Sequence, residues 1–299
     1  MYSLPQKDVL PIKSDQVIES AFVESLEKPA RLSDLRGVFK TISSRKGLKK
    51  ALDKGLVLLN GEQAQTGDWV RGGETVSLLR ELTNRPVLEL SVEVLFEDDH
   101  LAVVNKPAGI LVSGNKHRTL ENALPFNLQQ SSQMDALDWP QPIHRLDFPT
   151  SGVLLVGKTR TSVADLNRQF EEQLIHKEYM AITVGKMPEH GIVEIPINGK
   201  SAHTIFERVK CVKSEKYQTL NLVKLMPKTG RRHQLRKHMA ALGSPILEDE
   251  LYGLKRTGFE GKRLFLHASN LIFEHAVSGN RLNCECKLPA KFKELAIYF

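Results

Sequence analysis

Residues 142–156 read Pro-Ile-His-Arg-Leu-Asp-Phe-Pro-Thr-Ser-Gly-Val-Leu-Leu-Val, a lone carboxylate followed by an apolar run. The apolar run is short, aliphatic and bounded, which is typical of a buried strand. Pro149 and the Thr-Ser-Gly cluster predict a turn just ahead of that strand. Asp147 is therefore expected on a rigid sheet edge, although an isolated loop aspartate is most often a turn-forming or capping residue.

The chain has 299 residues, of which 41% are hydrophobic and 26% charged, and its net charge is +7. This composition is ordinary for a globular protein with room for two domains. The positive charge is concentrated in two clusters. Residues 31–60 hold eight basic residues against two acids, and residues 228–238 hold five lysines and arginines and no acid. Two separate basic clusters predict a nucleic-acid partner.

The three cysteines, Cys211, Cys284 and Cys286, are too few for a disulfide framework and indicate a reducing compartment. The first residues lack the apolar core of a signal peptide, and no stretch is long and apolar enough to span a bilayer. We therefore expect a cytoplasmic protein with no membrane partner.

Residues 1–30 are polar and weakly patterned, and we interpret them as an N-terminal arm that is either extended or a strand laid on another domain. Apolar residues at positions 32, 35, 39 and 42 then recur at helical spacing and predict a first helix. A second, strongly basic helix is expected over 45–54, with Ser43 or Ser44 as its N-cap.

A hairpin with a tight Asn60-Gly61 turn follows, and a closing strand ends near residue 79. These elements predict a small domain over residues 31–80. Asn84 and Pro86 interrupt the pattern, so we expect a linker over 81–90.

The small domain resembles the S4 RNA-binding domain in residues 31–35 and 44–61, with two short helices ahead of a hairpin. A solvated basic helix face without a ligand is the plainer interpretation of its charge. The resemblance implies an α/β RNA-binding domain whose contacts to RNA come from the second helix, through Arg45, Lys46, Lys49 and Lys50.

Residues 91–299 are expected to form a second domain of short strands with few helices. Such a pattern predicts an α+β fold with a mixed, largely antiparallel sheet. The expected helices cover 161–174 and 232–242, and the expected strands cover 92–96, 101–105, 152–157, 179–184, 191–195, 219–225, 264–273 and 281–287.

The second domain closely resembles the RluA-type pseudouridine synthases. Residues 144–152 match the family pattern H-R-L-D-x-x-T-S-G, and residues 229–238 match T-G-R-x-H-Q-[IL]-R-x-H. Shorter matches to K-x-Y-x-A, L-H-A and N-K-P-x-G occur at residues 177–181, 266–268 and 105–109. The matches occur in the same order as in the family and together span nearly the whole second domain.

The resemblance implies that Asp147 is the nucleophile or base and that Arg236 pairs with it. It also implies that Tyr179 stacks on the target base and that Leu266 packs on the other face of that base. By residue type alone, Arg236 would be a phosphate-binding or solvated helix residue, and the other two would be core residues.

Other basic residues are expected around the pocket and on the RNA path. His144 and Arg145 offer donors and positive charge beside Asp147, and Lys106 is assigned to a structural turn with a contact to phosphate. Phosphate contacts are also expected from Arg231, Arg232 and Lys237.

We expect an isomerase that converts uridines of a structured RNA, ribosomal RNA in particular, to pseudouridine. This reaction needs no cofactor and no metal, and we expect no obligate protein partner. His233 and His238 are five residues apart and would not share a helix face as metal ligands. Alternatives are a synthase acting on transfer RNA, a non-catalytic RNA-binding or ribosome-assembly factor, and a nuclease. A nuclease would need clustered carboxylates, whereas residues 248–250 are interpreted as turn and surface groups.

The sequence departs from the family pattern at a few places. Phe148 and Pro149 replace a common charged pair, Ser244 stands where His is frequent, and Glu248 replaces a Gly before Asp249. These departures bear on the RNA target and on loop detail.

Overall fold

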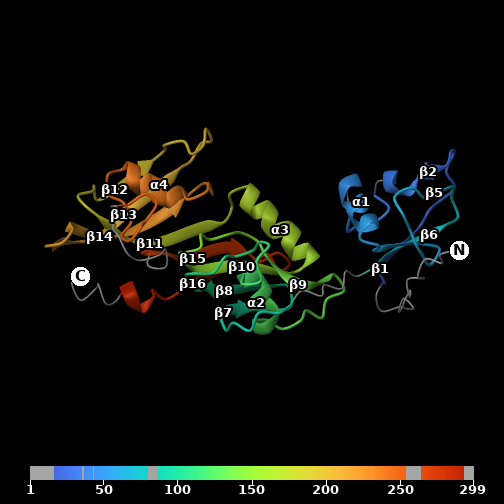
Figure 1. Ribbon diagram of the computed structural model, residues 1–299, viewed down its shortest axis with the longest axis horizontal. Coiled ribbons are helices and arrows are strands. Elements are labelled where there is room, and N and C mark those ends of the chain that lie inside the picture. The colour runs from blue at the N-terminus through green and yellow to red at the C-terminus, as the bar shows by residue number, and fades with distance from the viewer. Residues whose placement is uncertain (1–16, 36, 43, 80–85, 254–263, 293–299) are drawn as a thin grey trace, which may run out of the picture. The chain divides into compact units, whose positions relative to one another are not determined.

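The computed structural model describes residues 17–35, 37–42, 44–79, 86–253 and 264–292. The chain forms two compact units, Met1–Asn84 and Arg85–Phe299 (Figure 1). The division falls inside residues 81–90, the segment interpreted as a linker. Among the described residues, no helix has the length and apolar character needed to cross a bilayer.

The first unit is built on a four-stranded sheet with the order β1-β6-β3-β4 and a two-stranded β2-β5 ribbon. Asn60 and Gly61 both have positive φ, 51° and 88°, as the tight hairpin turn between β3 and β4 requires. The strands are β1 (Val17–Phe22), β2 (Ala30–Arg31), β3 (Val57–Leu59), β4 (Glu62–Gln63), β5 (Trp69–Val70) and β6 (Thr75–Leu79).

The N-terminal arm expected over residues 1–30 is wrong for its described part. Strand β1 pairs antiparallel with β6, so residues 17–22 belong to the sheet of the first unit. Residues 1–16 lie outside the described residues. A strand was one of the two forms expected for this segment, but on another domain. The boundary of the small domain was placed too late because Glu19 and Ser20 interrupt the short apolar pattern of β1.

The first helix of this unit is also not formed as expected. Only a 3₁₀ turn, Leu32–Asp34, is present, and Gly37 has a φ of 72°, which a continuing helix does not tolerate. Leu32 and Phe39 are nevertheless buried in one core. The spacing of apolar residues 32, 35, 39 and 42 therefore reflects their burial in one core and not a helix.

The second helix is present as α1 (Arg45–Asp53), and the Ser44 side chain caps it by accepting a hydrogen bond from the Gly47 amide at 3.1 Å. Ser43 lies outside the described residues. Three apolar residues of α1 face the core, while Arg45, Lys46, Lys49 and Lys50 are all exposed. The S4-like assignment stays a prediction, with the basic face of α1 open to solvent.

The second unit holds a ten-stranded sheet with the path β12-β13-β14-β11-β15-β10-β8-β7, with β16 paired to β15 and β9 to β10. The neighbouring strands are antiparallel except β10 and β15, as the α+β expectation requires. Its elements are β7 (Glu93–Glu97), β8 (Leu101–Lys106), α2 (Leu120–Asn127), β9 (Ala136–Pro142), β10 (Ser151–Thr159), α3 (Arg160–Glu171), β11 (His176–Val184), β12 (His190–Val193), β13 (Thr204–Ser214), β14 (Gln218–Pro227), α4 (Gln234–Ala241), β15 (Leu266–Glu274) and β16 (Arg281–Glu285).

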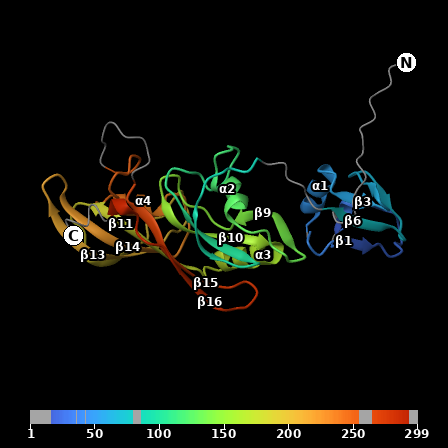
Figure 2. The same ribbon diagram turned by 90° about the horizontal axis from the view of Figure 1, so that it is seen from below.

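Strand β10 is the centre of this unit, because all nine of its residues are buried. Leu154 packs on one face with Leu120 and Leu124 of α2, and Leu155 packs on the other with Leu166 of α3. The two helices therefore cover opposite faces of β8 and β10. Figure 2 shows β15 and β16 running side by side at this sheet.

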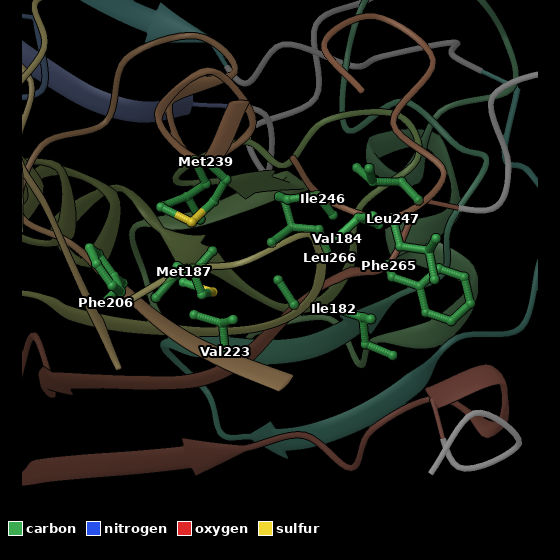
Figure 3. Packing of buried hydrophobic residues seen from close by; sticks show 14 of the residues in the cluster. Ile182, Val184, Met187, Phe206, Val223, Met239, Ile246, Leu247, Phe265 and Leu266 are labelled. Carbon is green, nitrogen blue, oxygen red and sulfur yellow. The ribbon is translucent and has the colours of Figure 1, made fainter. Parts of the chain in front are cut away.

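A further core lies under α4, where Met239 packs with Ile182 of β11 and Val223 of β14 (Figure 3). Leu266, at the start of β15, belongs to the same cluster. This core fixes the ends of β11, β14 and β15 relative to α4, which positions the site described below.

Three elements of the second unit were not expected from the sequence. Strand β13 is exposed or half-buried from Glu207 onward and carries four charged residues there, so it lacks a long apolar run. Strand β9 contains two prolines, and α2 carries Pro125 inside a single short helix. In each case tertiary packing overrides the local signal.

Candidate active site

A pocket with a volume of about 470 Å³ lies where β10 and β15 run parallel and where α4 begins. This volume is typical of small-ligand sites and accommodates a nucleobase. The residues expected from the sequence that line it are His144, Arg145, Asp147, Tyr179, Arg231, Arg232, Arg236 and Leu266. Lys237 is not part of this lining.

The loop that carries Asp147 is held by backbone contacts. The Thr150 amide donates to the Asp147 carbonyl at 3.0 Å, and the Gly109 amide donates to the Phe148 carbonyl at 2.8 Å. Gly152 has a φ of 117°, and a Cβ there would lie 2.1 Å from the Ala268 carbonyl oxygen. Only glycine allows β10 to approach β15 this closely. This close pairing fixes the start of β10 and therefore the position of the Asp147 turn that precedes it.

The side chain of Lys106, the last residue of β8, reaches into the Asp147 loop and has no exposed surface. The expected contact to phosphate is therefore wrong. Its Nζ donates to the carbonyl oxygen of Thr150 at 2.7 Å and to that of Pro107 at 3.0 Å. The carbonyl oxygens of Asp147 and Phe148 lie at 3.3 and 3.4 Å. Burial lowers the pKa of Lys106 to about 7, against the opposing charge of Asp147. The Lys106 side chain thus connects carbonyl oxygens of residues 107, 147, 148 and 150 and stabilises the loop.

The carboxylate of Asp147 lies between a guanidinium and an imidazole. Arg236 Nη1 is 3.7 Å from Oδ2, and His233 Nε2 is 3.7 Å from Oδ1. His233 takes a left-handed conformation, with a φ of 56°, and its Nδ1 is 2.9 Å from the Tyr252 hydroxyl. Burial lowers the pKa of His233, and the Asp147 charge opposes this shift. Because of this conformation α4 begins at Gln234, two residues later than expected.

Arg236 is oriented by a second carboxylate. Its Nε donates to Asp249 Oδ2 at 2.8 Å and its Nη2 to Asp249 Oδ1 at 2.6 Å. The Asp249 side chain has no exposed surface, so its interpretation as a surface group is wrong. Its interpretation as a turn group is confirmed, because Oδ1 accepts hydrogen bonds from the Leu251 and Tyr252 amides at 3.1 Å. Burial alone would lower the pKa of Arg236, but the hydrogen bonds and charge of Asp249 outweigh burial and raise it. Arg236 therefore stays charged with one free edge turned to Asp147.

Tyr179 and Leu266 come from adjacent strands, since β11 pairs with β15 and places Tyr179 opposite Ala268. Both side chains line the pocket with Asp147. Burial, and then the negative charge of Asp147, raise the pKa of Tyr179 above its usual range. Tyr179 is therefore a neutral phenol that offers a ring face and a hydroxyl to a bound base.

Comparison with known proteins places this arrangement in a family. The sequence profile described as RNA pseudouridylate synthase matches residues 100–241. The ribosomal large subunit pseudouridine synthase D of Xanthomonas campestris pv. campestris is 34% identical over 286 residues, covering 84% of this chain and 83% of that protein. The chain belongs to the RluA-type RNA pseudouridine synthases.

Two further relatives of this pseudouridine synthase are informative. The dual-specificity RNA pseudouridine synthase RluA of Vibrio parahaemolyticus is 34% identical and covers 66% of this chain and 83% of its own. The structure of human RNA pseudouridylate synthase domain containing 4 aligns with a TM-score of 0.55 and 26% identity, covering 68% of this chain and 92% of its own. The enzyme is an isomerase that acts on RNA.

His144 of the synthase does not carry the positive charge expected beside Asp147. Its Nε2 accepts a hydrogen bond from the Leu155 amide at 3.1 Å, and its ring lies 4.9 Å from the Phe170 ring. Burial and the charge of Lys177 lower the pKa of His144 to about 3. His144 is thus a neutral structural acceptor, while Arg145 remains exposed at the pocket wall.

The second basic cluster of the synthase divides into separate positions. Arg231 and Arg232 are exposed at the pocket, and Arg231 Nε donates to the Ser201 carbonyl at 2.9 Å. Lys237 lies over the Tyr252 ring at 5.8 Å. His238 points inward to Thr204 and Ile195. In the part of the chain that the structure describes, no group of three His, Cys, Asp or Glu residues could hold a metal ion.

The sequence reasoning missed the roles of three residues of this synthase: His233, which lines the pocket, and Asp249 and Lys106, which hold Arg236 and the Asp147 loop from outside its lining. His233 was considered only as a metal ligand and rejected, Asp249 was interpreted as a turn or surface acid, and Lys106 as a turn residue. The one signal that bore on Asp249 was its place after the family glycine position at Glu248, whose φ of 60° explains why glycine is suited there.

Proposed function

We propose that this enzyme isomerises specific uridines of large-subunit ribosomal RNA, with Asp147 as the nucleophile or base. The observation that carries the catalytic assignment is the position of the Asp147 carboxylate, 3.7 Å from Arg236 and 3.7 Å from His233 in a pocket large enough for a nucleobase. The ribosomal target is supported by the name of the Xanthomonas relative, a ribosomal large subunit synthase.

The reaction breaks the bond between C1′ of the ribose and N1 of uracil and forms a bond between C1′ and C5. C5 loses its proton and N1 gains one, so there is no net oxidation. Asp147 begins this exchange by adding to C6, by attacking C1′ or by removing a sugar proton, and these three routes stay open. Arg236 places a positive charge 3.7 Å from this carboxylate and orients it.

Tyr179 and Leu266 hold the extruded uracil between a ring face and an aliphatic face. Base–aromatic stacking contributes about 1 to 3 kcal/mol per base in single-stranded RNA complexes. The neutral phenol of Tyr179 can donate or relay a proton during transfer from C5, but it is not a phenolate base at neutral pH. These roles account for a pocket that combines an acid with two apolar walls.

The remaining basic residues are assigned to the RNA backbone. Arg145, Arg231 and Arg232 lie at the mouth of the pocket, and Lys237 lies beyond its lining. The exposed face of α1 with Arg45, Lys46, Lys49 and Lys50 supports a second contact from an S4-like unit. We propose the cytoplasm as the compartment, in line with the three free cysteines.

The test is chemical mapping of pseudouridine in total RNA from cells that carry the wild-type protein or the Asp147→Asn variant. Loss of one or a few sites in large-subunit ribosomal RNA is the expected result. Loss of sites only in transfer RNA would overturn the ribosomal target. No lost site, with RNA binding retained by the variant, would indicate an RNA-binding factor without catalysis.

A further inference from the structure

A second pocket adjoins the active-site pocket and shares Lys177 and Pro227 with it. Its volume is about 220 Å³. It lies at one end of the sheet, because β11 and β14 are antiparallel and the start of β11 lies beside the end of β14. The two pockets are therefore neighbours, with Lys177 and Pro227 in the wall of both.

Two lysines, one arginine and one histidine line this second pocket. His176 and Lys177 open β11, Lys228 directly follows β14, and Arg281 opens β16. Among the described residues that line it, Glu178 is the only acid. Segments from three separate places in the sequence thus bring positive charge to one small cavity.

Lys177 has no anionic partner in the described part of the chain. No carboxylate of the described residues lies within 4.0 Å of its ammonium or of the Lys228 ammonium. Burial lowers the pKa of Lys177, and the neighbouring charge of Lys228 lowers it further. A half-buried cation beside a second cation is unfavourable without an anion. Lys177 lies over the Phe170 ring at 5.7 Å, and Lys228 is exposed, so both ammonium groups remain available to a ligand that supplies negative charge.

We propose that the second pocket binds a backbone phosphate of the RNA strand next to the target uridine, held between Lys177 and Lys228 with Arg281 at the rim. This inference rests on the proposed function, because it takes the uridine to lie in the active-site pocket. The shared wall residue Lys177 connects the two positions. The subsite would hold the strand in register while the base is extruded, without reading sequence.

The test is binding of oligouridylate to the full-length protein, followed by fluorescence anisotropy at a series of salt concentrations. The variants are Lys228→Ala, Arg281→Ala and the double variant. Lys213→Ala, an exposed lysine of β13, is the matched control for loss of one charge. Melting temperatures are compared first, so that a change in binding is not a change in folding.

Removal of one phosphate contact from a single strand is expected to lower the slope of log Kobs against log salt by about 0.7 and to weaken binding about fivefold at low salt. Because Lys228 and Arg281 contact the same phosphate in this proposal, the double variant is expected to bind RNA only slightly more weakly than Lys228→Ala alone. Slopes and affinities equal to those of Lys213→Ala would overturn the subsite. Fully additive losses would overturn the single shared phosphate.

This experiment is independent of the identity of the natural RNA. If the mapping experiment finds no ribosomal site but the Lys228→Ala slope falls, the target is wrong and the subsite stands. If the ribosomal site is confirmed and the slopes do not change, the subsite is wrong and the proposed function stands.

Discussion

Arg236 meets Asp249 through two hydrogen bonds, of 2.8 and 2.6 Å, and presents its remaining Nη1 to Asp147 at 3.7 Å. The guanidinium thus lies between two carboxylates, of which one is fully buried and the other opens on the pocket. The paired geometry fixes the plane of the guanidinium more firmly than a single contact would. Asp249 is therefore a positioning residue for the catalytic acid, acting through Arg236.

Asp249→Asn is expected to lower kcat about tenfold to a hundredfold with little change in KM for RNA, because the variant loses the orientation of Arg236 rather than an RNA contact. It is also expected to destabilise the protein by about 3 kcal/mol, since one partner of a buried ion pair remains unpaired. Turnover kinetics and chemical denaturation measure the two effects. Glu215→Gln, at an exposed site, is the charge control, and an unchanged kcat in Asp249→Asn would refute the positioning role.

Lys106→Met is expected to loosen the Asp147 loop, because four carbonyl oxygens within 3.4 Å lose their common donor. A buried carbonyl oxygen left without a hydrogen-bond donor costs about 1 to 3 kcal/mol. We therefore expect the free energy of unfolding to fall by several kcal/mol. Denaturant titration measures this loss, and kcat at a temperature where the variant is folded measures the effect on Asp147. A variant as stable and active as the wild type would show that the loop is held by its backbone contacts alone.

Glu248→Gly is expected to stabilise the protein by about 0.5 to 1 kcal/mol. The φ of 60° at Glu248 is strained for a residue with a Cβ and unstrained for glycine, which outweighs the greater flexibility of glycine in the unfolded chain. Thermal unfolding of the variant measures the change. As a comparison, Glu250→Gly, two residues further on, has no positive φ to relieve and is expected to be neutral or destabilising.

His144 predicts a pH dependence of stability. Its pKa is about 3 in the folded protein and about 6.5 in the unfolded chain, so between these values only the unfolded chain binds the proton. The free energy of unfolding should therefore fall as the pH drops from 6.5 towards 3, by up to about 4 kcal/mol from this group. His144→Gln keeps an acceptor for the Leu155 amide and removes the titration. The difference between the two proteins should shrink in step with falling pH, and a constant difference would contradict the assignment.

Much of the second unit could be predicted because its signals are local. The aliphatic runs of β8 and β10 and the apolar stripe of α3 follow from periodicity alone. Strand β13 could not be predicted in this way, because its charged residues face solvent while its ladder to β14 supplies the stability. The first helix failed for the opposite reason, since Leu32 and Phe39 are buried at helical spacing without a helix between them.

The sequence by itself determined the family motifs, the acid Asp147, and the residues Arg236, Tyr179 and Leu266 that line its pocket. Only the tertiary structure decided which charges are paired and which are exposed. Lys106 turns inward, His144 is neutral and Asp249 clamps Arg236, because burial and long-range hydrogen bonds set the charge and direction of a side chain. These contacts join residues that are distant along the chain, so no local pattern records them.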